Sequence, residues 1–227
     1  MKNSTTYTKN IVSHRIDTII RQLKHKNVAD IGCDHGYTSI YACLGGFANN
    51  VIACDINQGP LSVATKNIQE HGLSEHIQTR LGSGLQPLHA GEVDSIIISG
   101  MGGELIVRIL QEGSHITPSL KQMILSPQSN MAKVREFVHS IGYTITDEIF
   151  IEENAKYYNI IMCEQGKEEP YTQGQYFLGK ILIDKKEELF VNYVQESIDK
   201  LLKIRERLSE ENKKEIDKKI EIYKTGL

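Results

Sequence analysis

Short runs of apolar and β-branched residues alternate with helical stretches over residues 1–165, and this alternation constrains the fold more than any other feature. Several runs are apolar throughout, as strands covered on both faces should be. The runs are VADIG (Val28 to Gly32), VIACD (Val51 to Asp55), IQTRL (Ile77 to Leu81), DSIIIS (Asp94 to Ser99) and KQMILS (Lys121 to Ser126). They predict an α/β fold with a mainly parallel sheet, preceded by a helix from about Ile11 to His25.

Two further β-rich runs, Tyr143 to Glu153 and Tyr157 to Cys163, lie only a few residues apart. Strands with so short a connection form a hairpin, in which the chain reverses its direction. We therefore expect a parallel sheet that is closed by one antiparallel strand.

The rest of the chain predicts a separate helical unit. The polar segment Glu164 to Gln175 contains one proline and two glycines, which is typical of a linker. Beyond it, two stripes of apolar residues at helical spacing flank a break at Ser209 to Asn212. Two antiparallel helices would bury both stripes, so we expect a coiled-coil-like helical hairpin and two domains, residues 1–165 and 176–227. The stripes are Phe190, Val194, Ile198, Leu201, Ile204 and Leu208, then Ile216, Ile220, Tyr223 and Leu227.

Composition excludes several classes of protein. No apolar run reaches the roughly 20 residues needed to cross a bilayer, and the first ten residues lack the apolar core of a secretory signal. We therefore expect a cytoplasmic protein with no membrane partner. The four cysteines form no CxxC pair, which argues against zinc, and we expect no metal.

The formal net charge of -3 is unevenly distributed, with basic residues concentrated toward the two ends of the chain. Such residues can grip an RNA backbone in a protein that is acidic overall, although a solvated helix surface has the same composition. The candidate phosphate contacts are Arg15, Lys24, Lys26, Lys200, Lys203, Arg205 and Arg207.

The stretch DIGCDHGY, from Asp30 to Tyr37, leads from the first strand into a helix. A turn of this kind places backbone N–H groups and a helix N-terminus around a ligand at the carboxyl edge of the sheet. A dinucleotide site would carry G-x-G-x-x-G, but Asp34 stands in place of the middle glycine. A carboxylate repels a diphosphate and attracts a sulfonium and an ammonium group, so the stretch favours S-adenosylmethionine over a nicotinamide cofactor.

Three further strand ends extend this candidate site. Asp55 ends the next strand about 20 residues on, where a carboxylate can accept hydrogen bonds from both ribose hydroxyls. Glycine and aspartate at strand ends often only make turns, but the two motifs together indicate a nucleotide site. Ser83 and Gly84 are expected near the adenine ring, unless they form a plain turn. SGMGGEL, from Ser99 to Leu105, should face the donor methyl group or serve only as a tight connection.

The segments VADIGCDHGY, VIACDI, GSGL and IISGMGGELI resemble, in order and spacing, the motifs of class I methyltransferases, and specifically of the bacterial tRNA (adenine(22)-N1)-methyltransferase family. The predicted hairpin resembles that family's second domain. The resemblance implies a Rossmann-like seven-stranded class I methyltransferase sheet, S-adenosyl-L-methionine as donor and methylation of N1 of an adenine in the D-arm region of tRNA. Two positions depart from the family pattern: Gly36 replaces a usual alanine, and Pro127 and Gln128 are transposed in LSPQSN.

These motifs define the candidate site residues. N1 of neutral adenine already offers a lone pair, so in-line placement matters more than a general base. The product ring is cationic, and Asp34 is the candidate for stabilising it, its alternative role being to hold the donor or the loop. The candidate catalytic residues are Asp34, Ser99, Gly100, Met101, Gly102 and Gly103. The candidate donor-binding residues are Asp30, Gly32, Cys33, Asp34, His35, Gly36, Asp55, Ile56, Ser83 and Gly84.

Three alternatives stay open. A catalytically silent RNA-binding or scaffold protein would keep the sheet, but it would not need Asp30, Gly32 and Asp55. A small-molecule methyltransferase would share the donor site without needing basic ends. A nicotinamide enzyme is disfavoured by Asp34. The oligomeric state is open, with a monomer favoured.

Overall fold

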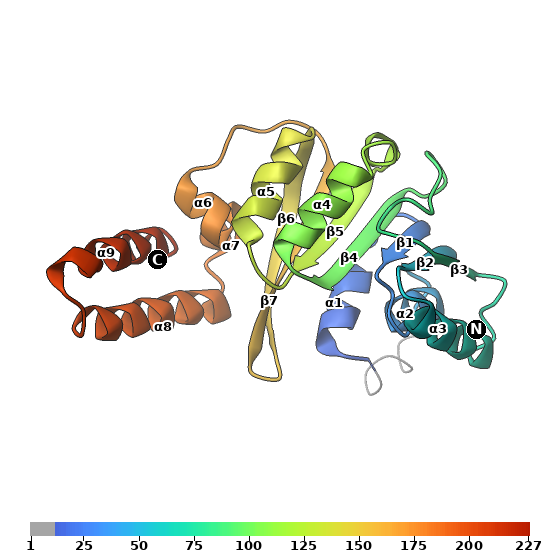
Figure 1. Cartoon of the computed structure of the whole chain (residues 1–227), viewed down its shortest axis with the longest axis horizontal. Helices are drawn as coiled ribbons and strands as arrows, with labels where there is room; N and C mark the ends of the chain where they lie inside the picture. The colour runs from blue at the N-terminus through green and yellow to red at the C-terminus, as the bar shows by residue number, and fades with distance from the viewer. Residues whose placement is uncertain (1–11) are drawn as a thin grey trace.

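The computed structural model describes residues 12–227, so Ile11 and the start of the predicted domain 1–165 lie outside the described residues. The described residues form one seven-stranded sheet in the order β3-β2-β1-β4-β5-β7-β6 (Figure 1). Every predicted strand is present, with ends that differ by at most two residues from the prediction. The strands are β1 Asn27–Ile31, β2 Asn50–Asp55, β3 Ile77–Leu81, β4 Ser95–Met101, β5 Gln122–Pro127, β6 Tyr143–Glu153 and β7 Lys156–Gln165.

The pairing of the strands fixes where a ligand can bind. The pairs among β1 to β5 are parallel, and β7 is antiparallel to both of its neighbours, β5 and β6. The predicted single antiparallel strand is therefore confirmed. The strand order reverses between β1 and β4, and in α/β sheets a ligand binds in the crevice at the carboxyl ends of the strands beside such a switch point.

Helices cover both faces of the sheet. One face is covered by α1, α2 and α3, which contribute Ile19, Ile40 and Leu61 to a buried cluster. The other face is covered by α4 and α5, which contribute Ile106 and Val134. The first helix, α1, is shorter than predicted: it begins at His14 and ends at Arg21. The bounds are α1 His14–Arg21, α2 Tyr37–Leu44, α3 Gln58–Glu70, α4 Gly103–Glu112 and α5 Met131–Ser140.

The C-terminal helices project from the β6 side of the sheet (Figure 1). Phe190, Val194 and Ile198 of α8 are buried against Phe150 of β6 and against α9, which confirms the base of the predicted apolar seam. Leu201, Ile216 and Tyr223 of the predicted stripes also pack against this cluster, whereas the prediction is wrong for Ile204 and Leu227, which are 48% and 43% exposed. The predicted break between the two helices is present, but it covers residues 206–209 and not 209–212. The helices are α6 Gln173–Leu178, α7 Lys180–Lys185, α8 Glu188–Arg205 and α9 Glu210–Lys224.

The segment Glu164 to Gln175, predicted as a linker, packs instead on the sheet domain. The Glu168 carboxylate accepts hydrogen bonds from the Thr144 hydroxyl and the Ile145 N–H, both at 2.8 Å. Tyr171 is buried and contacts the ring of His139 edge to face, with ring centroids 4.5 Å apart. The polar composition of this segment therefore reflects specific hydrogen bonds.

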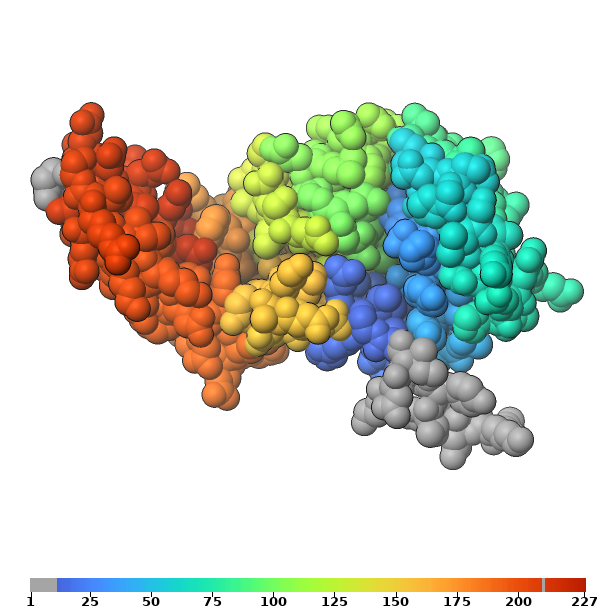
Figure 2. All heavy atoms as spheres, turned by 60° about the horizontal axis from the view of Figure 1, so that its bottom comes forward, coloured from blue at the N-terminus to red at the C-terminus, as the bar shows by residue number. Residues whose placement is uncertain are grey.

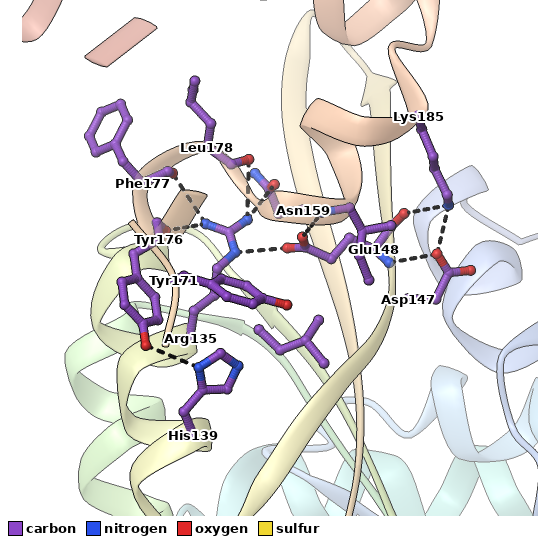
Figure 3. A network of polar contacts seen from close by, with 12 residues as sticks. Arg135, His139, Asp147, Glu148, Asn159, Tyr171, Tyr176, Phe177, Leu178 and Lys185 are labelled. Atoms are coloured by element: carbon purple, nitrogen blue, oxygen red, sulfur yellow. Dashed lines mark hydrogen bonds and ion pairs between the residues drawn. The ribbon is translucent and has the colours of Figure 1, made fainter. Parts of the chain in front are cut away.

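A buried ion pair joins the sheet to the helices that follow it. Arg135 of α5 lies 2.7 Å from Glu148 of β6, and the two side chains are 0% and 1% exposed. Arg135 also donates to the carbonyl oxygens of Tyr176 and Phe177 in α6, at 2.8 and 3.1 Å (Figure 3). Lys185 of α7 donates to the Glu148 carbonyl oxygen at 2.8 Å. These contacts fix α6 and α7 to the sheet.

Candidate functional site

A cavity of about 570 Å³ opens where the carboxyl ends of β1, β2 and β4 meet. Its volume lies in the range of small-molecule and cofactor sites, and its place is the crevice that the strand order predicts. Nine of the predicted site residues line it: Gly32, Asp34, Asp55, Ile56, Ser83, Gly84, Ser99, Gly100 and Met101.

The loop after β1 makes a tight turn at the floor of this cavity. Gly32 has φ +74°, and a Cβ added there would lie 2.1 Å from Met101 Cε, so the position requires glycine. The N–H groups of Gly32 and Cys33 both donate to the carbonyl oxygen of Cys54, at 2.8 and 2.9 Å. Asp34 has φ +50°, a strained conformation for a residue with a side chain.

Asp55 joins two of the loops around the cavity. Its carboxylate accepts hydrogen bonds from the Asn57 N–H at 2.8 Å and from the Asp34 N–H at 3.1 Å. The residue is 8% exposed and lies at the end of β2. Because each carboxylate oxygen can accept more than one hydrogen bond, Asp55 can also accept from a ligand in the cavity.

Asp30 lies beneath the cavity and does not line it. The residue is 4% exposed, and its carboxylate accepts a hydrogen bond from the Ser39 hydroxyl at 2.7 Å. Burial raises the pKa of Asp30 to about 6, with the Ser39 hydrogen bond acting in the opposite direction.

We expect the buried Asp30 to make the free energy of unfolding fall with pH between about pH 4 and about pH 6. This contribution to stability is fully present below the pKa that Asp30 has in the unfolded chain. It is lost as the pH rises through the pKa of Asp30 in the folded protein, because only the unfolded chain ionises this carboxyl group in that window. Two pKa units correspond to about 3 kcal/mol. Urea unfolding of the wild type and Asp30→Asn at several pH values measures this, and parallel pH profiles of the two proteins would contradict the prediction.

The loop after β4 is held against the loop after β5. A Cβ added to Gly103 would lie 2.5 Å from the Ser129 carbonyl oxygen, to which the Gly103 N–H donates at 2.9 Å. The Gln128 N–H donates to the Met101 carbonyl oxygen at 2.8 Å. Gln128 also lines the cavity, so the transposed Pro127 and Gln128 of the sequence place an amide side chain at the site.

Six predicted site residues do not line the cavity: Asp30, Cys33, His35, Gly36, Gly102 and Gly103. Burial raises the pKa of the Cys33 thiol far above its ordinary value, which keeps the thiol neutral. The His35 side chain is 48% exposed and caps no helix. Gly36 has φ +78° and begins α2. Tyr37, which follows this turn, is 43% exposed and outside the cavity.

The family model of the tRNA (adenine(22)-N(1))-methyltransferases, TrmK, matches residues 28–225. The chain belongs to this family. The Bacillus subtilis (strain 168) tRNA (adenine(22)-N(1))-methyltransferase is 32% identical over 227 residues, which cover 94% of this chain and 95% of the relative.

Solved structures of similar proteins agree with the TrmK family match. Sp1610 of Streptococcus pneumoniae, in complex with S-adenosyl-L-methionine, has a TM-score of 0.88 at 30% identity and covers 96% of this chain and 100% of its own. M. capricolum TrmK, in complex with S-adenosyl-homocysteine, has a TM-score of 0.82 at 27% identity and covers 94% and 96%. The Rossmann-like class I methyltransferase fold is thereby confirmed.

Sequence reasoning missed several lining residues of this TrmK family member. Arg108 and Glu112 line the cavity from α4, the helix that follows the glycine-rich loop. They are four positions apart and therefore lie on the same face of that helix. Their helical spacing after that loop was the available signal. Arg15 was expected to contact phosphate, but it lines this cavity from α1, and its guanidinium lies 4.8 Å from the centre of the Tyr158 ring.

The other basic residues that were predicted to contact phosphate in this TrmK family member differ in their hydrogen bonds and ion pairs. Lys24 pairs with Glu164, and Lys26 donates to the carbonyl oxygens of Gly46 and Phe47 at 2.6 and 3.1 Å. In the hairpin, Lys200 pairs with Glu196 at 3.3 Å and Arg205 with Asp217 at 2.5 Å. Lys203 and Arg207 make no side-chain hydrogen bond or ion pair within the described chain.

No helix within residues 12–227 combines the length and the apolar character needed to span a bilayer. No three His, Cys, Asp or Glu side chains of that range lie together as metal ligands would.

Proposed function

We propose that this protein transfers a methyl group from S-adenosyl-L-methionine to N1 of adenine 22 in tRNA. The observation that carries the proposal is the convergence of Gly32, Asp55 and the Ser99–Met101 segment on one cavity, in a chain of the TrmK family. The B. subtilis relative is named for this reaction, and the two solved structures contain the methyl donor and its product.

The cavity suits a cationic nucleoside donor. Its wall contains the carboxylates of Asp34, Asp55 and Glu112, which attract a sulfonium and an ammonium group, and the guanidinium groups of Arg15 and Arg108, which attract a carboxylate. We assign the two ribose hydroxyls to Asp55, the amino acid part to the turn at Gly32 and the adenine ring to the loop at Ser83 and Gly84. When bound, the donor supplies an electrophilic methyl group.

The acceptor side of the site works mainly by position. Neutral adenine needs no proton removed from N1, so the wall formed by Ser99, Gly100 and Met101 has to place N1 in line with the methyl group. Gly100 has φ +78° and no neighbouring atom within 4 Å of an added Cβ, which leaves room for a base. In a duplex, N1 is paired, so the protein has to receive the adenine unpaired.

Asp34 is our candidate for stabilising the positive charge that develops on the adenine ring. Its side chain is 70% exposed at the cavity wall, while its N–H is bound by Asp55. The backbone is therefore fixed and the carboxylate is accessible, as charge stabilisation requires.

We expect neutralising Lys203 and Arg207 together to weaken tRNA binding and to reduce the salt dependence of the binding constant. Each lost phosphate contact lowers the slope of log K against log salt by about 0.7 to 0.9. Fluorescence anisotropy of labelled tRNA at several salt concentrations measures both quantities. Lys66→Ala, on α3 at the opposite end of the sheet (Figure 1), is the matched control. An unchanged slope in the double variant would remove these contacts from the proposal.

The deciding experiment for the function uses labelled S-adenosyl-L-methionine and unmodified tRNA, followed by nucleoside digestion. We expect label in 1-methyladenosine with wild-type tRNA and none with tRNA that carries guanine at position 22. Donor binding without transfer to any tRNA would favour a small-molecule methyltransferase. An absence of donor binding would favour a scaffold protein. A cytoplasmic location and a monomeric state remain predictions that fit this substrate.

A further inference from the structure

The β6–β7 hairpin extends past the carboxyl end of β5. β7 pairs with β5 only from Leu125 opposite Ile161 to Gln122 opposite Glu164, whereas it pairs with β6 as far as Lys156 opposite Glu153. Residues 149–160, which we call the arm, therefore continue beyond the neighbouring strand. Figure 2 shows the gold-coloured arm between the orange start of α8 and the blue α1.

The arm and α8 enclose a second cavity of about 420 Å³, which we call the aromatic cleft. Phe150 and Tyr157 of the arm are stacked with their ring planes 14° apart, and Tyr193 of α8 lies 5.0 Å from both rings. Phe150 is buried and supports the two tyrosine rings, which are partly exposed at the cleft. Exposed aromatic rings of this kind bind unstacked nucleobases. The described residues that line the cleft are Gln128, Met131, Phe150, Ala155, Lys156, Tyr157, Tyr158, Asn159 and Tyr193.

The chemistry of the cleft suits a neutral, flat ligand with polar edges. Among the described lining residues, Lys156 is the one with a charge, and Gln128 and Asn159 provide amide groups. The Asn159 oxygen already accepts a hydrogen bond from Arg135 at 3.3 Å, so its NH2 group is the part left for a ligand. The amides can pair with the donor and acceptor edge of a base, while the rings stack on its face. Free phosphate or a carboxylate would find a single exposed lysine there.

The aromatic cleft adjoins the donor cavity. Gln128 lines both cavities, and Tyr158 of the cleft lies under the guanidinium of Arg15, which lines the donor cavity. The Arg15 Nε atom is buried and has no hydrogen-bond partner in the described chain. An unpaired guanidinium between two cavities is suited to a phosphate group, which it can bind through two parallel hydrogen bonds. The Glu153 carboxylate accepts a hydrogen bond from the backbone N–H of Arg15 at 3.3 Å.

We propose that the aromatic cleft binds the unstacked base next to the target adenine, with Arg15 on the phosphate that joins the two nucleotides. The proposal rests on the function proposed above, because the target base itself has to lie against Ser99–Met101, on the donor side of Gln128. A second, stacked base holds the RNA strand open beside the target. This role requires α8 to pack against the arm, as it does through Phe150 and Phe190.

The test uses two tRNAs in which 2-aminopurine replaces the nucleotide on the 5′ or the 3′ side of the target adenine. Fluorescence of 2-aminopurine falls when the base stacks on an aromatic ring. We expect one of the two positions to be quenched on binding to the wild-type protein. Tyr157→Leu and Tyr193→Leu should each remove this quenching and lower kcat/KM for tRNA about tenfold. Their Kd for S-adenosyl-L-methionine should not change, since neither residue lines the donor cavity.

Three comparisons make the result specific. Tyr157→Phe keeps the ring and should restore both quenching and kcat/KM. Phe177→Leu, an exposed aromatic residue of α6 outside the cleft, should behave as the wild type. Thermal unfolding of every variant shows whether the fold is kept. If the wild type methylates tRNA but quenches neither 2-aminopurine, the cleft does not bind a neighbouring base, whereas a wild type that methylates no tRNA removes the underlying function first.

Discussion

Replacing Asp55 by alanine is expected to weaken binding of S-adenosyl-L-methionine at least about 100-fold and to abolish methyl transfer. A carboxylate that accepts two ribose hydroxyls loses two charged hydrogen bonds, each worth about 1.5 to 3 kcal/mol. The same substitution frees the N–H groups of Asp34 and Asn57, so the loop after β1 keeps only its backbone hydrogen bonds from Gly32 and Cys33 to Cys54 of β2. Calorimetric titration of the donor and initial rates of transfer measure the two effects.

Two further variants test whether the loss of donor affinity comes from the Asp55 carboxylate itself. Asp55→Asn keeps one acceptor oxygen and should bind the donor between the wild type and the alanine variant. Asp94→Ala is the control. Asp94 directly precedes β4, at the amino ends of the parallel strands and away from the cavity, and pairs with Lys121, so its loss should leave donor binding unchanged. Wild-type donor affinity in Asp55→Ala would contradict the assignment of Asp55 to the ribose.

The second large effect is expected at the buried ion pair of Arg135 and Glu148. Removing one partner leaves an unpaired buried charge, which costs about 3 to 5 kcal/mol of stability. Arg135→Met should in addition release the carbonyl oxygens of Tyr176 and Phe177 from their donor. Denaturant unfolding gives the loss of stability, and hydrogen exchange of residues 173–185 shows whether α6 and α7 open first.

The double variant Arg135→Met with Glu148→Met tests the reason for the effect. Apolar side chains of similar volume remove both charges, so the double variant should be more stable than either single variant. Additive losses in the double variant would show that the charges contribute independently, against the interpretation as a coupled pair. Lys133→Met, which removes an exposed partner of Glu104, is the control and should leave stability nearly unchanged.

Local patterns were sufficient for the strands and for the ends of strands. Ile77–Leu81 and Tyr143–Glu153 have the predicted bounds, because short apolar runs between turn residues are governed by neighbours in sequence. Gly32 and Asp55 were found for the same reason, since each follows directly from the end of a parallel strand. These features depend on a few consecutive residues.

Features that depend on distant partners were not predictable in this way. Glu168 looked like a linker residue, but its partners Thr144 and Ile145 lie more than 20 positions earlier. Ile204 continues a helical stripe, yet it is 48% exposed and lies outside the apolar cluster that joins α8 to α9. Gln128 belongs to the site because β5 lies beside β4, and that neighbourhood is a property of the whole sheet.

β6, one of the two edge strands of the sheet, also affects how the protein behaves in concentrated solution. β6 has pairing partners on one side only, and the free side of such a strand can add a strand from another copy. A bulge between Ile145 and Asp147 interrupts its register, and Lys185 occupies the carbonyl oxygen of Glu148. Cutting away α7 to α9 would uncover this strand together with the apolar side chain of Phe150. A truncated sheet domain would therefore tend to aggregate through β6.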